Sequence, residues 1–457
     1  LDSQPNRLGD VFRETLHQHT RGYALFTVEL LRGMQARGDL AQDPEGRWVE
    51  GPALDWETLP ARIEAVIAQR IGRLPEGLRA ALAAASVEGE IFTAEVLAQV
   101  EQASVEETVR SLSDQLDRKH QLVSAQGILR MGDRSLSQYR FRHILYQKHL
   151  YNGLDPVRRT VLHREVGSAL ETLYAEGAEA TALGEASAAQ LARHFEAAGN
   201  AEKAVGYLRQ AGERAQRLYA NQEADRYFRQ ALALLDGVSS HGSGEAWRRE
   251  TATQLRENLG DILEWTGEHN KARESYDQAS AGMPTGDPIW QARLRRKMGN
   301  IWRLQRRYEK AVQSYERAES ALGKVSAGSA PERWQEWVQI QLERMWLHYW
   351  LGEWHHISAL ADQTRPIVEQ HGTPTQCISF FLSSASMYSR RDRYVISAET
   401  LAFCQTALAI SLESENLAEI AWARFMLGFS QLWCGNLDEA EKQMQEALEL
   451  AQRTGDV

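Results

Sequence analysis

The stretch LARHFEAAGNAEKAVGYLRQA, residues 191–211, decides the fold of this chain. Small and apolar residues recur in it at helical spacing on either side of a Gly-Asn pair, which predicts two helices joined by a short turn. From the first small residue, the key positions follow at fixed intervals: Ala192, Phe195, Gly199, Ala204, Leu208 and Ala211.

The same spacing returns along the rest of the chain. Full copies lie at 260–279, 299–318 and 428–447, and a partial copy lies at 212–231. Between about 334 and 416 the copies are degenerate, and Trp350-Leu351-Gly352 is the best trace. We interpret the small residues as close crossings of two antiparallel helices, and the aromatic residue as filling the gap between one hairpin and the next. The pattern is identified as the tetratricopeptide repeat (TPR), which implies an α-superhelix over 183–457.

Composition limits the functional classes that the chain can belong to. Its 457 residues suggest about three domains, and the net charge of −10 disfavours nonspecific DNA binding by the whole chain. The sequence has no apolar run long enough for a membrane span. Its three cysteines, Cys377, Cys404 and Cys434, form no CxxC pair and suit a reducing, cytoplasmic location. Because the chain opens at Leu1 rather than Met, we expect it to be a segment of a larger protein.

The front third has a different pattern from the repeats. Apolar residues at helical spacing predict helices within 9–37 and 60–72, then at 76–88, at 93–100 and from Ser104, with Glu107 completing a capping box. Alternating β-favouring residues at 121–141 predict a β-wing, and Trp48-Val49 a short strand. A helix from His143 and another at 157–175 follow. We therefore predict an all-α chain: a small helical and winged-helix region, then the repeat superhelix.

Three phrases in this region carry a second resemblance: TRGYALFTVELLR (20–32), LPARIEAVIAQRIGRLPEGLRAALAAASVEGEIF (59–92) and YRFRHILYQKHLY (139–151). They resemble segments of STAND-class signalling ATPases, AAA-type proteins with TPR tails that include maltose-regulator-like, LuxR-like and SARP-like regulators and nucleotide-cyclase fusions. The resemblance implies ATPase lid-like helices at 1–75, a winged-helix domain at 76–153, a linker helix at 154–182 and the TPR superhelix at 183–457.

The same resemblance points to residues near a nucleotide in the parent protein. The family's glycine turn corresponds to Gly22, its adenine-side proline to Ala24, and its phosphate-sensing histidine to His143; a local hydrogen bond at a helix start is the alternative for His143. The chain lacks a GxxxxGK[ST] loop and an acidic Walker-B strand. We therefore expect no ATP hydrolysis and no cofactor in this chain, with ATP or ADP held by an NTPase domain elsewhere in the parent protein.

A winged helix could instead bind DNA. Residues 110–148 have eight basic and three acidic residues, which is the sign that DNA binding needs. The expected third helix, however, carries four acidic residues, which disfavours entry into a major groove. We expect an internal regulatory module rather than a nucleic-acid reader.

A strongly basic segment, RLRRKMGNIWRLQRR (293–307), suggests a groove for an acidic or mixed peptide. On the first helix of a TPR, the side chains of Arg296, Asn300 and Arg303 would face the concave groove, and the first two resemble half of a clamp for a peptide carboxylate. The next unit offers Leu342, Trp346 and Tyr349 in place of the other half, so the clamp is incomplete. The alternatives are a solvated helix balanced by acids, and a tryptophan-rich core between repeats.

No catalytic set and no metal site is predicted. We find no Ser/His/Asp or Cys/His arrangement with a local signature. His355 and His356 are adjacent, so we expect them to point from different faces of a helix rather than to share a metal.

Two functional hypotheses remain. In the first, the chain is the sensor and relay of a STAND-type ATPase, and its superhelix binds a protein, peptide or small ligand to control an effector outside this chain. In the second, it is a passive TPR scaffold without nucleotide control. Neither involves a membrane.

Overall fold

The structure of this chain is a computed structural model that describes residues 5–20, 24–51, 54, 56, 61–131, 134–175, 180–237, 244–282, 287–326, 328–414 and 416–454. Contacts divide the chain into two compact units, 1–238 and 239–457, and each is described by itself. The domain boundaries expected from the sequence stay predictions.

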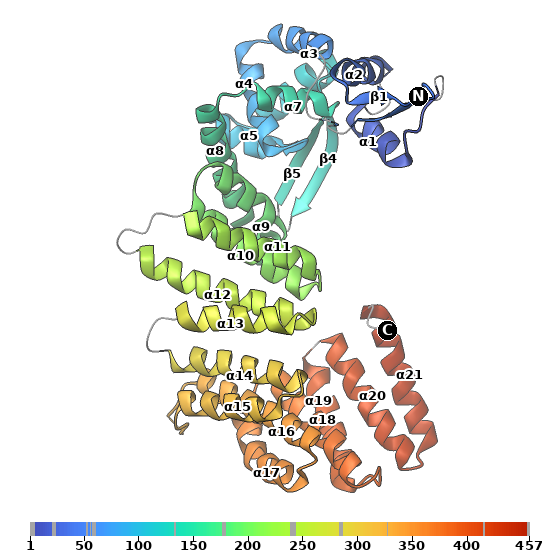
Figure 1. The fold of residues 1–457 in the computed structure, drawn as a ribbon. Coiled ribbons are helices and arrows are strands. Elements are labelled where there is room, and N and C mark those ends of the chain that lie inside the picture. The colour runs from blue at the N-terminus through green and yellow to red at the C-terminus, as the bar shows by residue number, and fades with distance from the viewer. Residues whose placement is uncertain are drawn as a thin grey trace. The chain divides into compact units, whose positions relative to one another are not determined.

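The first unit begins with helices and a small two-stranded sheet (Figure 1). Val49 pairs with Ala41 in antiparallel register, so the strand predicted at Trp48-Val49 is present, together with a partner strand that the sequence did not reveal. The elements are α1 (Asp10–Thr20), α2 (Ala24–Arg37), β1 (Leu40–Gln42), β2 (Trp48–Glu50) and α3 (Ala61–Gly72).

Short helices and a three-stranded antiparallel sheet follow. The predicted β-wing is the β4–β5 hairpin, whose tip at 132–133 lies outside the described residues, and β3 adds a third strand so that the order is β3-β5-β4. Ser104 caps α6 by accepting a hydrogen bond from the Glu107 backbone at 3.2 Å. The elements are α4 (Glu76–Glu88), β3 (Ile91–Thr93), α5 (Ala94–Glu101), α6 (Val105–Arg110), the π-helix η1 (Ser111–Lys119), β4 (Val123–Met131), β5 (Arg134–Phe141) and α7 (Ile144–Asn152).

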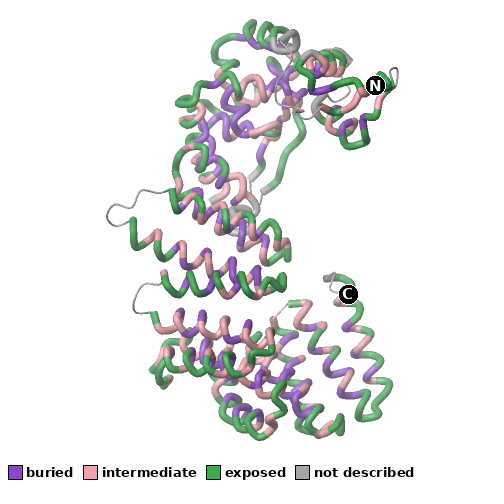
Figure 2. The backbone as a smooth tube through the Cα atoms, in the orientation of Figure 1, coloured by how far each residue is buried: buried purple, intermediate pink, exposed green. Residues whose placement is uncertain are grey.

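Four longer helices complete the first unit, and the opening sequence stretch forms two of them. Asn200 caps the second helix of this pair by accepting a hydrogen bond from the Lys203 backbone at 3.1 Å. Buried residues line the faces where the helices meet (Figure 2). The helices are α8 (Pro156–Ala175), α9 (Ala180–Ala197), α10 (Ala201–Arg217) and α11 (Asn221–Gly237).

The described residues of the second unit form consecutive antiparallel helix pairs, including the 334–416 region where the sequence pattern is degenerate. The paired helices are the TPR-type arrangement that the repeats predict. They are α12 (Gly244–Trp265) with α13 (His269–Gly282), α14 (Pro288–Leu304) with α15 (Tyr308–Leu322), α16 (Pro331–Leu351) with α17 (Trp354–His371), α18 (Pro374–Arg391) with α19 (Ala398–Glu413), and α20 (Leu417–Trp433) with α21 (Leu437–Thr454).

In α10–α11, α12–α13 and α14–α15, a glycine on the first helix faces an aromatic ring on the second. A Cβ added to Gly260 of α12 would lie 2.3 Å from the ring of Tyr276 in α13. A Cβ on Gly212 would likewise lie 2.4 Å from Phe228. The aromatic side chain therefore packs against the other helix of its own hairpin, which corrects our interpretation that it fills the gap between hairpins. Only glycine permits so close an approach of ring and backbone.

In the copies of the repeat pattern, the residue seven positions after the first small residue takes the left-handed conformation. Glycine takes this conformation at Gly199 and Gly267, whereas Tyr219 and Arg306 take it with φ of 58° in each case. Side chains other than glycine adopt this conformation infrequently. The backbone of the turn is therefore maintained where the sequence motif is lost.

Among the described residues, no helix combines the length and the apolar character needed to cross a membrane.

The glycine–ring contact predicts opposite effects of alanine at two positions of α10. Gly212→Ala forces a methyl group into the Phe228 ring, and we expect a loss of about 1–3 kcal/mol of unfolding free energy. At Gly206 no neighbouring atom lies within 4 Å of an added Cβ, so Gly206→Ala should stabilise the helix by about 0.5–1 kcal/mol. Urea denaturation followed by circular dichroism measures both; equal effects would contradict the packing role of Gly212.

Candidate functional site

The basic segment that the sequence singled out lies on α14, between acidic faces of α12 and α16. Because helix residues three or four positions apart share a face, each helix contributes a short row of polar side chains. We call the resulting set the charged ladder: Glu257, Asp261 and Glu264 of α12, Arg296, Lys297, Asn300 and Arg303 of α14, and Glu336 and Glu343 of α16.

Arg296 joins α14 to α16. Its Nε donates a hydrogen bond to Oε1 of Glu336 at 2.6 Å, and its Nη1 contacts Oε1 of Glu343. The side chains are 12%, 8% and 13% exposed, respectively. Burial alone would lower the pKa of the Arg296 guanidinium, but the facing carboxylates of Glu343 and Glu336 outweigh it, and the pKa is raised. Arg296 is therefore a fixed cation whose charge is compensated within the protein.

Lys297 and Asn300 join α14 to α12. The ammonium group of Lys297 lies 2.7 Å from carboxylate oxygens of both Glu257 and Asp261, while the amide of Asn300 donates to Glu264. Burial raises the pKa of Glu257, but the attraction of Lys297 and its other partners prevails, and the pKa is lowered overall. Burial, reinforced by repulsion from Glu343, raises the pKa of Glu264.

The three predicted peptide contacts on α14 therefore have partners within the chain. Arg296 is bound by two carboxylates, Asn300 by Glu264, and Arg303 donates to Oδ1 of Asn300 at 3.1 Å. An incoming peptide carboxylate would have to displace Glu336 or Glu343 from Arg296. Helical spacing placed these three residues on one face of α14. It did not reveal that acidic residues of α12 and α16 pair with Asn300 and Arg296.

The two predicted aromatic contacts lie between α16 and α18. The indole Nε1 of Trp346 donates to Oγ of Ser383 at 3.1 Å, and the hydroxyl of Tyr349 accepts a hydrogen bond from Nη1 of Arg390 at 2.7 Å. Their rings meet edge to face, with centroids 5.3 Å apart. This pair links neighbouring hairpins, which is the alternative that the tryptophan-rich composition had suggested.

The nucleotide-proximal candidates lie in the first unit. Gly22 lies outside the described residues, and Ala24 is the first residue of α2, its side chain undescribed. His143 is buried and caps α7, with its Nδ1 accepting a hydrogen bond from the Leu145 backbone at 3.1 Å. That bond is the local role weighed for His143, and its approach to a phosphate of the parent protein stays a prediction.

A buried polar cluster, which we call the junction, connects α4 and α7 to α8 and α9 in the first unit. His163 of α8 accepts or donates at both ring nitrogens: Nε2 lies 2.9 Å from the Tyr151 hydroxyl, and Nδ1 lies 3.1 Å from Nδ1 of His194. Arg193 donates to the backbone carbonyl of Glu88 at 2.7 Å. Burial lowers the pKa of His163 to about 4 and that of His194 to about 3, so both rings are neutral near pH 7.

The Glu88 side chain is the acidic member of the junction. Its Oε1 accepts hydrogen bonds from the backbone and the hydroxyl of Thr93, both at 3.1 Å. Burial raises the pKa of Glu88 to about 8, so the carboxyl is largely protonated at neutral pH. Sequence reasoning did not single out any member of the junction.

An apolar groove with exposed aromatic rings runs along α20 and α21. Trp422 and Phe425 stack with centroids 5.5 Å apart and are 55% and 41% exposed. We call this surface the aromatic groove; its empty volume is about 830 Å³, and it is lined by Ala418, Ala421, Trp422, Phe425, Met444, Ala447, Leu448 and Ala451. Exposed apolar patches with aromatic residues are typical of protein-interaction surfaces. In the sequence, the signal for this groove is a pair of large aromatic residues, Trp422 and Phe425, at positions outside the buried face of the helix at 417–433.

No family model matches this chain, and no curated protein matches it. Solved structures do. The chain is similar to a Signal Transduction ATPase with Numerous Domains (STAND) protein with a tetratricopeptide repeat sensor from Pyrococcus horikoshii, with 12% identity and a TM-score of 0.55. The match covers 98% of this chain and 58% of that protein, so this chain spans little more than half its length. The shared property is the fold: a small mixed region and TPR-type helix pairs.

Two other matches have lower TM-scores. Aspartyl phosphate phosphatase F from Bacillus subtilis matches with 10% identity and a TM-score of 0.43, covering 86% of this chain and 88% of that one. The apo form of RapI matches with 11% identity and a TM-score of 0.41, covering 86% and 99%.

Removing the cation of Arg296 should be costly because two buried carboxylates would lose their partner. We expect Arg296→Met to lower the unfolding free energy by about 3–5 kcal/mol. Arg249→Met is the control, since Arg249 pairs with Glu245 on the solvent face of α12, where such a pair contributes about 0–1 kcal/mol. Guanidinium denaturation followed by tryptophan fluorescence compares them. A similar small loss in both variants would mean that the charged ladder is solvated.

The junction predicts a pH-dependent stability. The pKa of Glu88 is about 8 in the folded protein and near 4.5 in the unfolded chain. Between these two pH values the folded protein binds more protons than the unfolded chain, so its unfolding free energy falls as pH rises. Relative to wild type, the unfolding free energy of Glu88→Gln should therefore rise from pH 5 to pH 8. The gain is at most about 1.4 kcal/mol for each unit by which the folded and unfolded pKa values of Glu88 differ. Thermal melts across that range measure it, with Glu76→Gln at an exposed position of α4 as control. A constant difference between Glu88→Gln and wild type would refute the raised pKa.

Proposed function

We propose that this chain is the sensor and relay segment of a STAND-type signalling ATPase. Its TPR-type hairpins bind a protein or peptide, and the resulting change in population of two conformations reaches an effector outside the chain. The order of modules supports the proposal, since the chain has the same fold as a STAND protein with a TPR sensor along 98% of its length.

The observation that carries the binding part of the proposal is the aromatic groove. Trp422 and Phe425 offer large, stacked and solvent-exposed rings beside small alanines, a shape that suits the apolar face of an amphipathic helix. The charged ladder is less suited to capture a carboxylate, because the charge of Arg296 is already compensated by Glu336 and Glu343.

The relay part rests on the junction. His163, His194 and Arg193 connect the helices next to the β-hairpin module with the first helices of the repeat pattern, and all of their contacts lie inside the first unit. Buried polar contacts need matched partners, so a shift of α9 would break specific hydrogen bonds rather than deform them gradually. A two-state element of this kind can couple the two modules.

We also propose that this chain does not hydrolyse ATP by itself, since it carries no phosphate-cradling lysine loop. A passive TPR scaffold is the second candidate function, and the aromatic groove serves it equally well. The two differ in the parent protein: a phosphate-binding loop with its lysine favours the nucleotide-controlled sensor, and a loop without the lysine favours the scaffold.

The binding proposal is tested by the effect of single tryptophan substitutions on partner capture. The full chain, as wild type, Trp422→Glu and Trp350→Glu, is immobilised and exposed to lysate, and captured proteins are quantified by mass spectrometry. Trp350 is the matched control because it is 53% exposed but lies outside the aromatic groove. We expect at least one partner that wild type and Trp350→Glu retain to fall about tenfold with Trp422→Glu. Identical capture by all three would contradict this role of the groove.

A further inference from the structure

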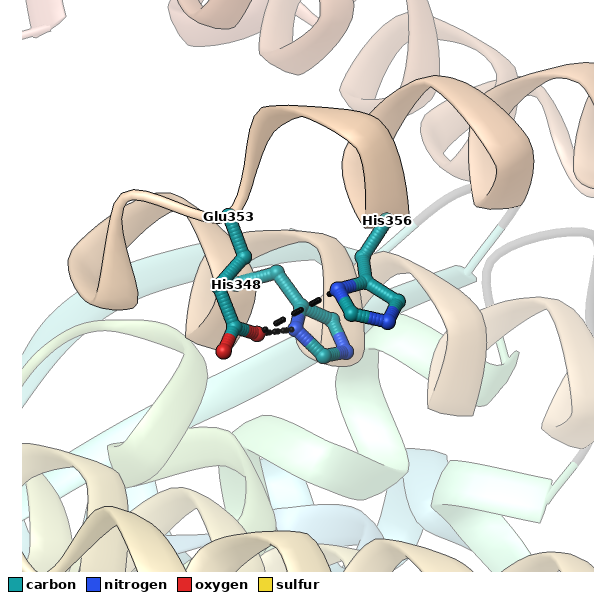
Figure 3. Close-up of side chains that lie close together, drawn as sticks. All are labelled: His348, Glu353 and His356. Atoms are coloured by element: carbon teal, nitrogen blue, oxygen red, sulfur yellow. Dashed lines mark hydrogen bonds and ion pairs between the residues drawn. The ribbon is translucent and has the colours of Figure 1, made fainter.

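The turn between α16 and α17 brings three side chains with metal-binding chemistry together (Figure 3). His348 comes from the last turn of α16, Glu353 from the residue before α17, and His356 from the first turn of α17. One ligand atom from each lies within 4.8 Å of the others. Within the described part of the chain, no other group of three such residues is as close.

The carboxylate of Glu353 contacts both imidazole rings (Figure 3). Its Oε2 is 2.7 Å from Nδ1 of His348 and 3.5 Å from Nδ1 of His356. The rings are nearly parallel, with centroids 4.9 Å apart. The sequence argument against a metal considered His355 and His356 as a pair; the structure pairs His356 with His348, which lies across the turn.

The triad brings together the donor types that a metal binds, which are imidazole nitrogens and a carboxylate oxygen. Arg344, one turn before His348 on α16, is paired with Glu319 at 2.7 Å.

We propose that His348, Glu353 and His356 form a Zn²⁺ site that fastens α16 to α17. Two imidazole nitrogens and one carboxylate oxygen are a donor set that Zn²⁺ accepts, with the fourth position left to water. Because Nδ1 of His348 faces Glu353 in the metal-free protein, Zn²⁺ takes the place of the hydrogen between them, and the ring's N–H moves to Nε2 so that the imidazole stays neutral. His356 is 51% exposed and turns its ring to complete the site.

The position of the site explains what the metal would do. At the positions where other hairpins have a glycine facing a ring, the α16–α17 hairpin has Met345 and Ala361, both buried. A metal that bonds to both helices stabilises the folded hairpin because the unfolded chain does not hold its ligands in place. Zn²⁺ binding therefore raises the stability of a hairpin that lacks the contact between a glycine and a ring.

The test is a titration of the untagged, chelator-treated full chain with Zn²⁺ at pH 7.5 by calorimetry. We expect one tight equivalent and a rise in melting temperature with Zn²⁺ concentration. Co²⁺ in place of Zn²⁺ should give visible absorption bands that Zn²⁺ abolishes by displacement.

The variants identify the ligands. His356→Ala removes an exposed ring with little risk to folding and should weaken Zn²⁺ binding by more than about 100-fold, beyond the effect of an outer-shell residue. Glu353→Gln keeps the size of the side chain and should weaken binding similarly. His355→Ala is the matched control, an exposed neighbour outside the triad, and should bind as wild type does. Unchanged binding by His356→Ala, loss of binding by His355→Ala, or no tight equivalent in the wild type would overturn the proposal.

Discussion

The contact between a glycine and an aromatic ring in the same hairpin is the constraint on which the repeat region depends. Because Gly212, Gly260 and Gly299 have no side chain, the rings of Phe228, Tyr276 and Tyr315 lie directly on the opposing backbone. This sets how closely the two helices approach, and therefore which residues of the next helix they can contact. The same 16-residue separation places Met444 over Gly428 in α20–α21. A hairpin spaced in this way leaves a continuous apolar face for its neighbour.

Polar contacts determine how successive hairpins align in the second unit. Within the charged ladder, Lys297 is fixed by acids on α12, and Arg296 is fixed by acids on α16. Apolar faces can slide over one another, whereas buried charges need partners at particular atoms. The cations of α14 therefore set the register of three helices. This role accounts for a cluster of basic residues without any external ligand.

The sequence predicted the paired helices wherever both the glycine and the ring of the motif are present. It did not resolve α16 to α19, because Met345 and Ala361 reverse the usual order of small and large residues there. The structure confirms the β-wing that the alternating pattern predicted. The sequence did not predict β3, which has only three residues and no alternating pattern of its own. A three-residue strand depends on its partner, which here is β5.

Prediction of the candidate sites was more limited, for a related reason. Helical spacing placed Arg296, Asn300 and Arg303 on one face, yet the partners of Arg296 and Asn300 come from helices about 40 residues away in the chain. Long-range pairs such as Arg296 with Glu336, or His163 with His194, have no local signal. Spacing within one helix shows which side chains share a face, but the neighbouring helix decides whether that face is available.

The left-handed turns also determine what the edge of the repeat array presents to solvent. Tyr219, Arg306 and Tyr394 adopt this conformation although it costs a residue other than glycine about 1–2 kcal/mol, so the packing of the paired helices outweighs that cost. Each turn can then carry a large side chain at no loss of architecture. Tyr394, in the turn between α18 and α19, shows one use of this freedom: its ring stacks on that of Trp433 at the end of α20, with centroids 4.9 Å apart. Within each unit, the side chains at these turns can therefore differ while the helices behind them stay in place.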